Sequence, residues 1–366
     1  MAQLRINTNK IIGNITKINR ILQKHDIQWS LVAKILAGNK EVLRKILSHP
    51  EIKKLHSIAD SRLTGLRAIK SIDPEITTMY AKPPAMDSIK SVVTYADISL
   101  NSSFKTIEAL DKEAGRQGKT HRVIIMIELG ELREGIIREH VLTFYKKVFD
   151  LKNVVIEGIG ANLGCMYGIQ PTYDKLLQLS LYKQLIEAKF DTSFSLISGG
   201  SSITLPLVGK PSMPKNLNHL RIGEAAFLGT TPIDNEKFRT LATDAFEYRA
   251  NIIELELKET SPDGVLTEGN IGHTVENNEQ QDYQHSYRAI LDFGLLDVDI
   301  QELKAKDPEI KFAGTTSDMS VYDLGPALKN KSCKYKVGDK VIFVPSYMAI
   351  ARLMSSKFID KSVDHT

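Results

Sequence analysis

The sequence contains few cysteines and no long apolar run. Cys165 and Cys333 are the only cysteines among 366 residues, which is too few for a disulfide framework and typical of a reducing compartment. No stretch of about 18 apolar residues occurs, and the first residues lack the apolar core of a signal peptide. We therefore expect a cytoplasmic protein with no membrane partner.

An excess of charge of one sign is also absent. The 48 basic residues are balanced by 44 acidic ones, and the formal net charge is only +4. Because no basic stripe of the kind that binds nucleic acid occurs, we expect no nucleic-acid partner. With 42% hydrophobic and 25% charged residues, the composition is that of a soluble globular protein, and the length suits one large domain with a smaller one.

Strand-like and helix-like segments alternate through roughly the first 220 residues. Eight apolar runs predict strands, and amphipathic stretches such as 102–115 follow most of them. This alternation indicates a TIM (β/α)8 barrel, which we place at 11–233. A doubly wound open sheet is disfavoured because no GxGxxG turn follows the first strand. The predicted strands end at Asn39, Asp60, Ala81, Leu100, Leu129, Asn162, Ser198 and Gly223.

From about Asp234 the pattern changes to short strand-like runs separated by turn-forming sequences. Runs such as NIIELELKE and KVIFVPSY are broken by SPDG, GNIG, KDPE and VGDK, which predicts a smaller, mostly β domain over 234–366. We expect residues 1–10 to contribute a strand that packs with this domain. The polar segment 270–286 is expected to form a mobile loop, and whether it closes over a site stays open.

One lysine stands inside the first apolar run, LVAKILAGN, at position 34. Removing an ammonium group from water is costly, so a lysine in a buried strand needs an explanation. Lys34 either reaches solvent or a carboxylate at the end of the strand, or its desolvated amine is a nucleophile toward an aldehyde. The residues of this run do not decide between the two.

Two glycine-containing turns stand where a barrel usually binds phosphate, after its seventh and eighth strands. SGGSS at 198–202 allows close backbone approach and offers hydroxyl groups, and RIGEA at 221–225 offers a glycine turn before a helix. A lysine on the first strand then faces a phosphate site across the barrel mouth. Pyridoxal 5′-phosphate (PLP) requires this layout, because its aldehyde and its phosphate lie on opposite sides of one ring.

The chain resembles the barrel-fold PLP enzymes of the alanine racemase superfamily, and most closely its ornithine racemase branch. Six short motifs follow one another in the order of that family: LVAKILAGN, ADSRLTGL, VIIMIELGELREG, GIGANLGC, SGGSS and LRIGEAAFLG. The resemblance implies a PLP-dependent amino-acid racemase, an isomerase, that works as a head-to-tail homodimer with shared active sites. Its preferred substrate would be a basic amino acid such as ornithine or lysine.

The resemblance also implies which residues bind the cofactor. Lys34 would form the Schiff base with the aldehyde of PLP. Ser201 and Ser202, with the N–H groups around Ile222 and Gly223, would hold its phosphate.

Three further residues match the family near the cofactor ring. Arg221 would face the pyridine nitrogen and keep it unprotonated, because a guanidinium does not release its proton. Arg133 matches an arginine near the ring hydroxyl and the substrate carboxylate, although the residue alone also fits a charged surface loop. Asn162 stands where alanine racemases carry a histidine that contacts the ring, and a purely structural role is equally compatible with it.

The chain departs from the alanine racemase pattern at the second catalytic base. Leu295, in FGLLD, stands where those enzymes carry a tyrosine, so the base on the opposite face of the substrate must be another group. Cys165 and Tyr347 are the candidates, although a small buried hydrophobe and an ordinary strand tyrosine are the alternative interpretations. Asp318 would bind an ammonium group of the substrate.

Three other functions remain open for the sequence. One is a PLP-dependent D-amino-acid aldolase or dehydratase on the same scaffold, which would need a metal site that no compact histidine and cysteine cluster provides. Another is a non-catalytic PLP-binding protein, but proteins of that type lack a second domain. An inactive paralogue is the third. We expect no metal.

Overall fold

The computed structural model describes residues 1–265, 272–274, 284–326 and 333–364. The chain forms two compact units. Residues 8–243 make up the barrel unit, and residues 1–7 together with 244–366 make up the β unit. These boundaries lie three residues before and ten residues after the ones placed from the sequence, at 10/11 and 233/234. Most of the 270–286 segment lies outside the described residues.

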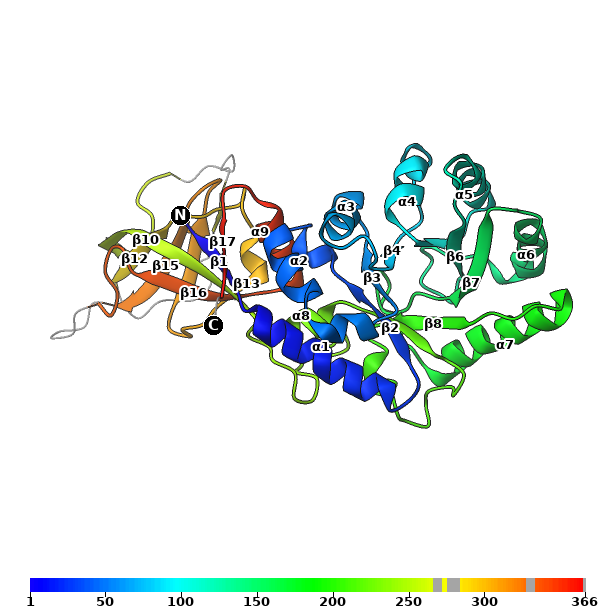
Figure 1. Cartoon of the computed structure of the whole chain (residues 1–366). Helices are drawn as coiled ribbons and strands as arrows, with labels where there is room; N and C mark the ends of the chain where they lie inside the picture. The colour runs from blue at the N-terminus through cyan, green and yellow to red at the C-terminus, as the bar shows by residue number, and fades with distance from the viewer. Residues whose placement is uncertain (266–271, 275–283, 327–332, 365–366) are drawn as a thin grey trace. The chain divides into compact units, whose positions relative to one another are not determined.

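Eight parallel strands close into a barrel, in which the last strand pairs with the first (Figure 1). Inward-facing apolar residues of several strands fill its interior, among them Met79, Ile98 and Met126. This architecture, followed by a mostly β sheet, confirms the predicted fold class. The barrel strands are β2 (Gln28–Val32), β3 (Ser57–Asp60), β4 (Thr78–Tyr80), β5 (Ile98–Asn101), β6 (His121–Met126), β7 (Val154–Gly160), β8 (Leu196–Ser201) and β9 (His219–Ile222).

Helices surround the barrel, and most of them bury an apolar face, whereas α7 leaves Leu181 and Leu185 about half exposed. In the helix predicted at 102–115, Ile107, Leu110 and Ala114 are fully buried, as their spacing indicates. The helices are α1 (Thr8–Gln23), α2 (Lys40–Leu47), α3 (Leu63–Ile72), α4 (Ile89–Tyr95), α5 (Phe104–Arg116), α6 (Val141–Phe149), α7 (Tyr173–Phe190) and α8 (Glu224–Leu228). Short 3₁₀ helices are η1 (Lys34–Leu36), η2 (Pro50–Lys54), η3 (Met86–Ser88), η4 (Arg138–His140) and η5 (Leu205–Leu207).

The prediction that Lys34 lies inside a buried strand is wrong. Strand β2 ends at Val32, and Lys34 opens the 3₁₀ turn that follows, with an exposed side chain. The chain turns here because Ala37 has a left-handed backbone, with φ of 49°, and because Asn39 caps helix α2 by accepting a hydrogen bond from the N–H of Val42 at 3.0 Å. Lys34 therefore stands at the carboxyl end of β2.

The β unit is built on a nine-stranded sheet, in which β1 (Gln3–Ile6) pairs antiparallel with β10 (Phe246–Glu259) and parallel with β17 (Asp360–Val363). Tyr347 does not lie in a strand, because Ser346 caps a helix, α9 (Tyr347–Ser355), that begins there. The other strands are β11 (His273–Thr274), β12 (His285–Leu291), β13 (Leu303–Ala305), β14 (Lys311–Thr315), β15 (Ser320–Pro326) and β16 (Lys340–Pro345), with η6 (Ile300–Glu302). Among the helices that the described ranges contain, none is long and apolar enough to cross a membrane.

Candidate active site

A buried arginine lies at the carboxyl end of the barrel. Arg221, on β9, is 5% exposed. Its Nη2 donates hydrogen bonds to the carbonyl of Ala161 at 2.8 Å and to Oδ1 of Asn162 at 3.3 Å, and its Nη1 donates to the carbonyl and the hydroxyl of Ser198. Burial lowers the pKa of Arg221 to about 10, which leaves the guanidinium charged at neutral pH.

These hydrogen bonds leave one donor of Arg221 for a ligand. Both terminal nitrogens have protein acceptors, whereas Nε–H has none within the described part of the chain. A guanidinium carries five N–H donors and no acceptor. Arg221 can therefore offer a single N–H to an acceptor atom while its other side is held by the barrel.

A chain of polar side chains continues from Arg221 across the ends of β6 and β7. Asn162 Nδ2 donates to Glu134 Oε1 at 2.8 Å, Arg133 pairs with Glu134, and Arg133 Nη1 contacts Sγ of Cys165. Burial alone would lower the pKa of Arg133, but the hydrogen bond and the charge of Glu134 raise it above its ordinary value. The structure thus brings together four of the residues that the sequence indicates: Arg133, Asn162, Cys165 and Arg221.

A carboxylate that the sequence analysis missed organises the loop that carries Cys165. Glu131 is 2% exposed and accepts hydrogen bonds from four backbone N–H groups of the loop after β7. These bonds lower its pKa, although burial acts in the opposite direction. The donors are Cys165 at 3.2 Å, Met166 at 2.8 Å, Tyr167 at 3.0 Å and Ile169 at 2.8 Å.

The two turns predicted to bind phosphate lie next to each other at the ends of β8 and β9. Ser202 is buried, and its hydroxyl accepts a hydrogen bond from the N–H of Ala225 at 3.2 Å, which joins the turns. Gly200 has a φ of 125°, and a Cβ there would lie 2.3 Å from Oγ1 of Thr204, so only glycine fits. Hydroxyls and glycine-rich backbone at adjoining turns form a donor set that suits a phosphate group.

Lys34 lies at the same end of the barrel, in the turn that follows β2, the strand next to β9, since Leu31 of β2 pairs with Ile222. A second carboxylate that the sequence analysis missed stands at the end of the next strand. Asp60 is 2% exposed, and its Oδ1 accepts a hydrogen bond from the N–H of Arg62 at 2.8 Å. Burial raises the pKa of Asp60 to about 6, while the positive charges of Arg62 and Lys34 act to lower it.

The remaining predicted residues belong to the β unit. The N–H of Leu295 donates to the carbonyl of Thr316 at 3.0 Å, and that of Leu296 donates to Ser317 at 2.9 Å. This pairing brings the loop of Leu295 beside the loop that carries Asp318, which is exposed. Tyr347 lies at the start of α9 instead.

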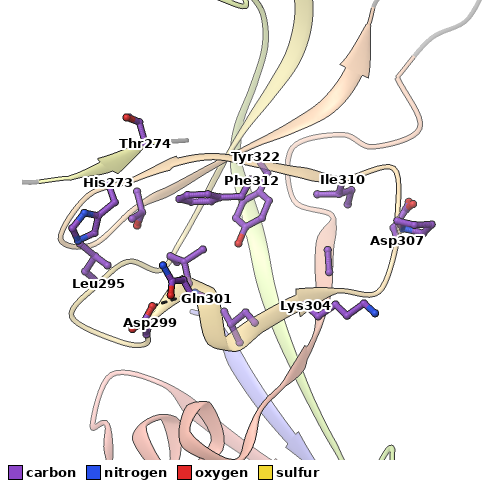
Figure 2. A pocket seen from close by; sticks show the side chains of 15 residues that line it. His273, Thr274, Leu295, Asp299, Gln301, Lys304, Asp307, Ile310, Phe312 and Tyr322 are labelled. Carbon is purple, nitrogen blue, oxygen red and sulfur yellow. Dashed lines mark hydrogen bonds between the residues drawn. The ribbon is translucent and has the colours of Figure 1, made fainter. Parts of the chain in front are cut away.

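The β unit also contains a pocket of ≈ 660 Å³ that the sequence did not indicate (Figure 2). The rings of Phe312 and Tyr322 lie 5.6 Å apart in it, and Leu295 lies at one end with His273. Asp299 accepts a hydrogen bond from the N–H of Gln301 at 3.1 Å.

Fold and site together define a (β/α)8 barrel enzyme with a mostly β second domain. The family model for the alanine racemase N-terminal domain matches residues 6–231. The chain therefore belongs to the alanine racemase family, as its motifs indicate, and it is an isomerase of the amino-acid racemase class.

Two curated relatives align with nearly the whole chain. An ornithine racemase of Acetoanaerobium sticklandii is 31% identical over 362 residues, which are 99% of each protein. A lysine racemase of Thermotoga maritima is 27% identical over 98% of this chain and 97% of its own.

Solved structures share the fold at low sequence identity. An alanine racemase of Clostridium difficile 630 superposes with a TM-score of 0.72 at 16% identity, covering 99% of this chain and 95% of the other. A D-threonine aldolase of Filomicrobium marinum gives 0.68 at 11% identity, over 97% and 88%.

Proposed function

We propose that the protein is a PLP-dependent racemase of basic amino acids. The observation that carries the proposal is Arg221, which is buried and charged, has four of its N–H groups held by the barrel, and has one N–H that no described residue accepts. The two curated relatives, named for ornithine and lysine, support a basic substrate. An aldolase or dehydratase is not favoured, because both relatives are racemases.

The donors and acceptors at the barrel end fit PLP. Lys34 would bind its aldehyde carbon, Ser201 and Ser202 with the N–H groups of Ile222 and Gly223 would hold its phosphate, and Nε–H of Arg221 would face its ring nitrogen. When bound, PLP supplies an electron-withdrawing ring that makes the Cα proton of an amino acid acidic.

The side chains of this protein would bind the substrate and transfer the Cα proton. Arg133, whose charge is secured by Glu134, would bind the substrate carboxylate. The amine of Lys34 would take or return a proton on one face of Cα, and a second group must serve the other face. We propose Cys165 for this role, because it contacts Arg133 in the same hydrogen-bonded chain, and Tyr347 remains the alternative.

Specificity for a basic side chain would come from a carboxylate. Asp318 is exposed on a loop that lies beside Leu295, where an apolar side chain takes the place of the family tyrosine. We propose that the enzyme is a cytoplasmic homodimer with shared active sites, in which Asp318 pairs with the side-chain ammonium of the substrate.

The test is racemization of single enantiomers by the purified protein with PLP in heavy water. We expect L-ornithine or L-lysine to racemize and L-alanine to react poorly. In Asp318→Asn, KM for the basic substrate should rise about tenfold or more, since a charged hydrogen bond is lost, while the slow reaction of alanine should not change. Racemization confined to alanine would overturn the proposed substrate.

The same assay tests Cys165. In Cys165→Ser, racemization should fall about 100-fold or more, because a general acid–base group contributes that much. One enantiomer should still exchange its Cα proton for deuterium through Lys34. Cys333→Ser removes the other cysteine and serves as the control. If C165S and C333S racemize equally fast, Cys165 is not the second base.

A further inference from the structure

A row of buried polar side chains leads from Arg221 into the barrel interior. Ser198 Oγ lies 2.8 Å from Nδ1 of His219, and Nε2 of His219 lies 2.9 Å from Oγ of Ser30. Ser30 in turn lies 2.7 Å from Oγ of Ser57. These four residues are at most 3% exposed. Because the row lies on β2, β3, β8 and β9, it ties Arg221 to the strands on either side of the barrel closure.

Burial decides the charge of His219. It lowers the pKa of the ring well below its ordinary value, and the neighbouring charges of His56 and Arg221 act in the same direction. His56 lies edge-on to His219, with 4.9 Å between ring centroids, and its own Nε2 faces Glu157 at 3.0 Å. His219 is therefore neutral, with one ring nitrogen that donates and one that accepts.

The guanidinium of Arg221 determines which atoms donate and which accept along this row of hydrogen bonds. Arg221 can only donate, so Ser198 Oγ accepts from it. A hydroxyl that accepts a hydrogen bond from a cation becomes a stronger donor, and the hydrogen of Ser198 then points to Nδ1 of His219. It follows that His219 carries its hydrogen on Nε2 and donates it to Ser30.

We propose that His219 is a positioning residue for Arg221, which acts through Ser198 to fix the direction in which the guanidinium presents Nε–H to a bound cofactor. This inference rests on the proposed PLP function. Without an acceptor on His219, the Ser198 hydroxyl can rotate, and Nη1 of Arg221 keeps only the carbonyl of Ser198, at 3.3 Å, as a fixed partner. The guanidinium would then have more freedom to turn about that bond and the bonds that its Nη2 makes to Ala161 and Asn162.

The barrel contains a matched control. Ser99, on β5, forms the same kind of buried pair with His121, 2.8 Å from its Nε2. That pair has no hydrogen bond to Arg221 among the described residues. Ser99→Ala and Ser198→Ala should carry a similar cost in stability, because each leaves a buried histidine nitrogen unpaired and takes an acceptor from a second donor, Asn101 Nδ2 or Arg221 Nη1.

The experiment compares S198A, His219→Leu, His219→Asn and S99A with the wild type, by titration with PLP and by the pH dependence of the visible band of the bound cofactor. We expect S198A and H219L to weaken PLP binding about tenfold, as for the loss of one hydrogen bond to a charged group, and to shift the pH at which the band changes. H219N places a side-chain amide, which can accept a hydrogen bond, near Ser198, so it should recover most of the wild-type PLP binding. S99A should resemble the wild type.

Each outcome separates this inference from the function on which it rests. If the wild type binds no PLP, the proposed function is wrong. If the wild type binds PLP but S198A and H219L behave as S99A does, His219 does not position Arg221. A ¹⁵N spectrum of labelled histidine in the cofactor-free protein gives a second readout, because a neutral ring with its hydrogen on Nδ1 would overturn the direction that we infer.

Discussion

Single residues at the barrel end show how burial tunes charge. Arg221 and Asp60 are both almost fully buried, and each pKa moves toward the neutral form of the group. Arg221 starts so high that it stays charged, whereas Asp60 titrates near pH 6. The protein therefore holds a fixed positive charge on β9 and a carboxyl group of variable charge on β3.

This difference predicts a pH dependence of stability. Because its pKa is raised on folding, Asp60 keeps its proton to a higher pH in the folded than in the unfolded chain. Raising the pH from about 4 to 6 should therefore cost the wild type about 2 kcal/mol of unfolding free energy, and this loss should be absent in Asp60→Asn. Unfolding of both proteins in denaturant, measured across that range, checks this. Asp87→Asn removes an exposed carboxylate and controls for net charge. An equal pH slope in wild type and D60N would contradict the prediction.

At the scale of elements, the strands of the barrel could be predicted from the sequence and the loops could not. The apolar runs fix where strands β3 to β9 stand, because a parallel barrel buries both faces of each strand. The position of His219 beside Arg221 could also have been predicted, because His219 precedes Arg221 by two residues and so lies on the same face of β9. The role of Glu131 could not be predicted, because its partners 165–169 lie in another loop and only the closed barrel brings the two loops together.

The Glu131 contact makes the loop after β7 dependent on the loop after β6. Glu131→Gln keeps one acceptor oxygen but replaces the other with an NH₂ group that faces backbone donors, so hydrogen bonds are lost. We expect amide exchange at 165–169 to become at least about tenfold faster and unfolding free energy to fall by about 2 kcal/mol. Glu128 accepts from Gly130 and Arg133 within its own loop, so E128Q should loosen that loop alone. If amide exchange at 165–169 is the same in E131Q and in the wild type, the order of this loop does not depend on Glu131.

At the scale of the whole molecule, the β unit is discontinuous in sequence. Residues 1–7 belong to it, whereas 8–243 form the barrel unit. A chain that begins at Thr8 would lack β1, which lies between β10 and β17 and pairs with both. We expect this truncation to speed amide exchange in β10 and β17 and to leave the barrel strands protected. Equal loss of protection in both units would contradict it.

The pairing of β1 with β17 also sets an order of events during synthesis on the ribosome. All eight barrel strands have been made once residue 222 leaves the exit tunnel, so the barrel can close while the rest of the chain is still being translated. Strand β1 can pair with β10 once residue 259 has been made, but its other edge must wait for β17, which ends at Val363. Until then one edge of β1, whose apolar residues Leu4 and Ile6 are fully buried in the finished sheet, stays unpaired. The second edge of β1 is thus completed only after all eight barrel strands have been made.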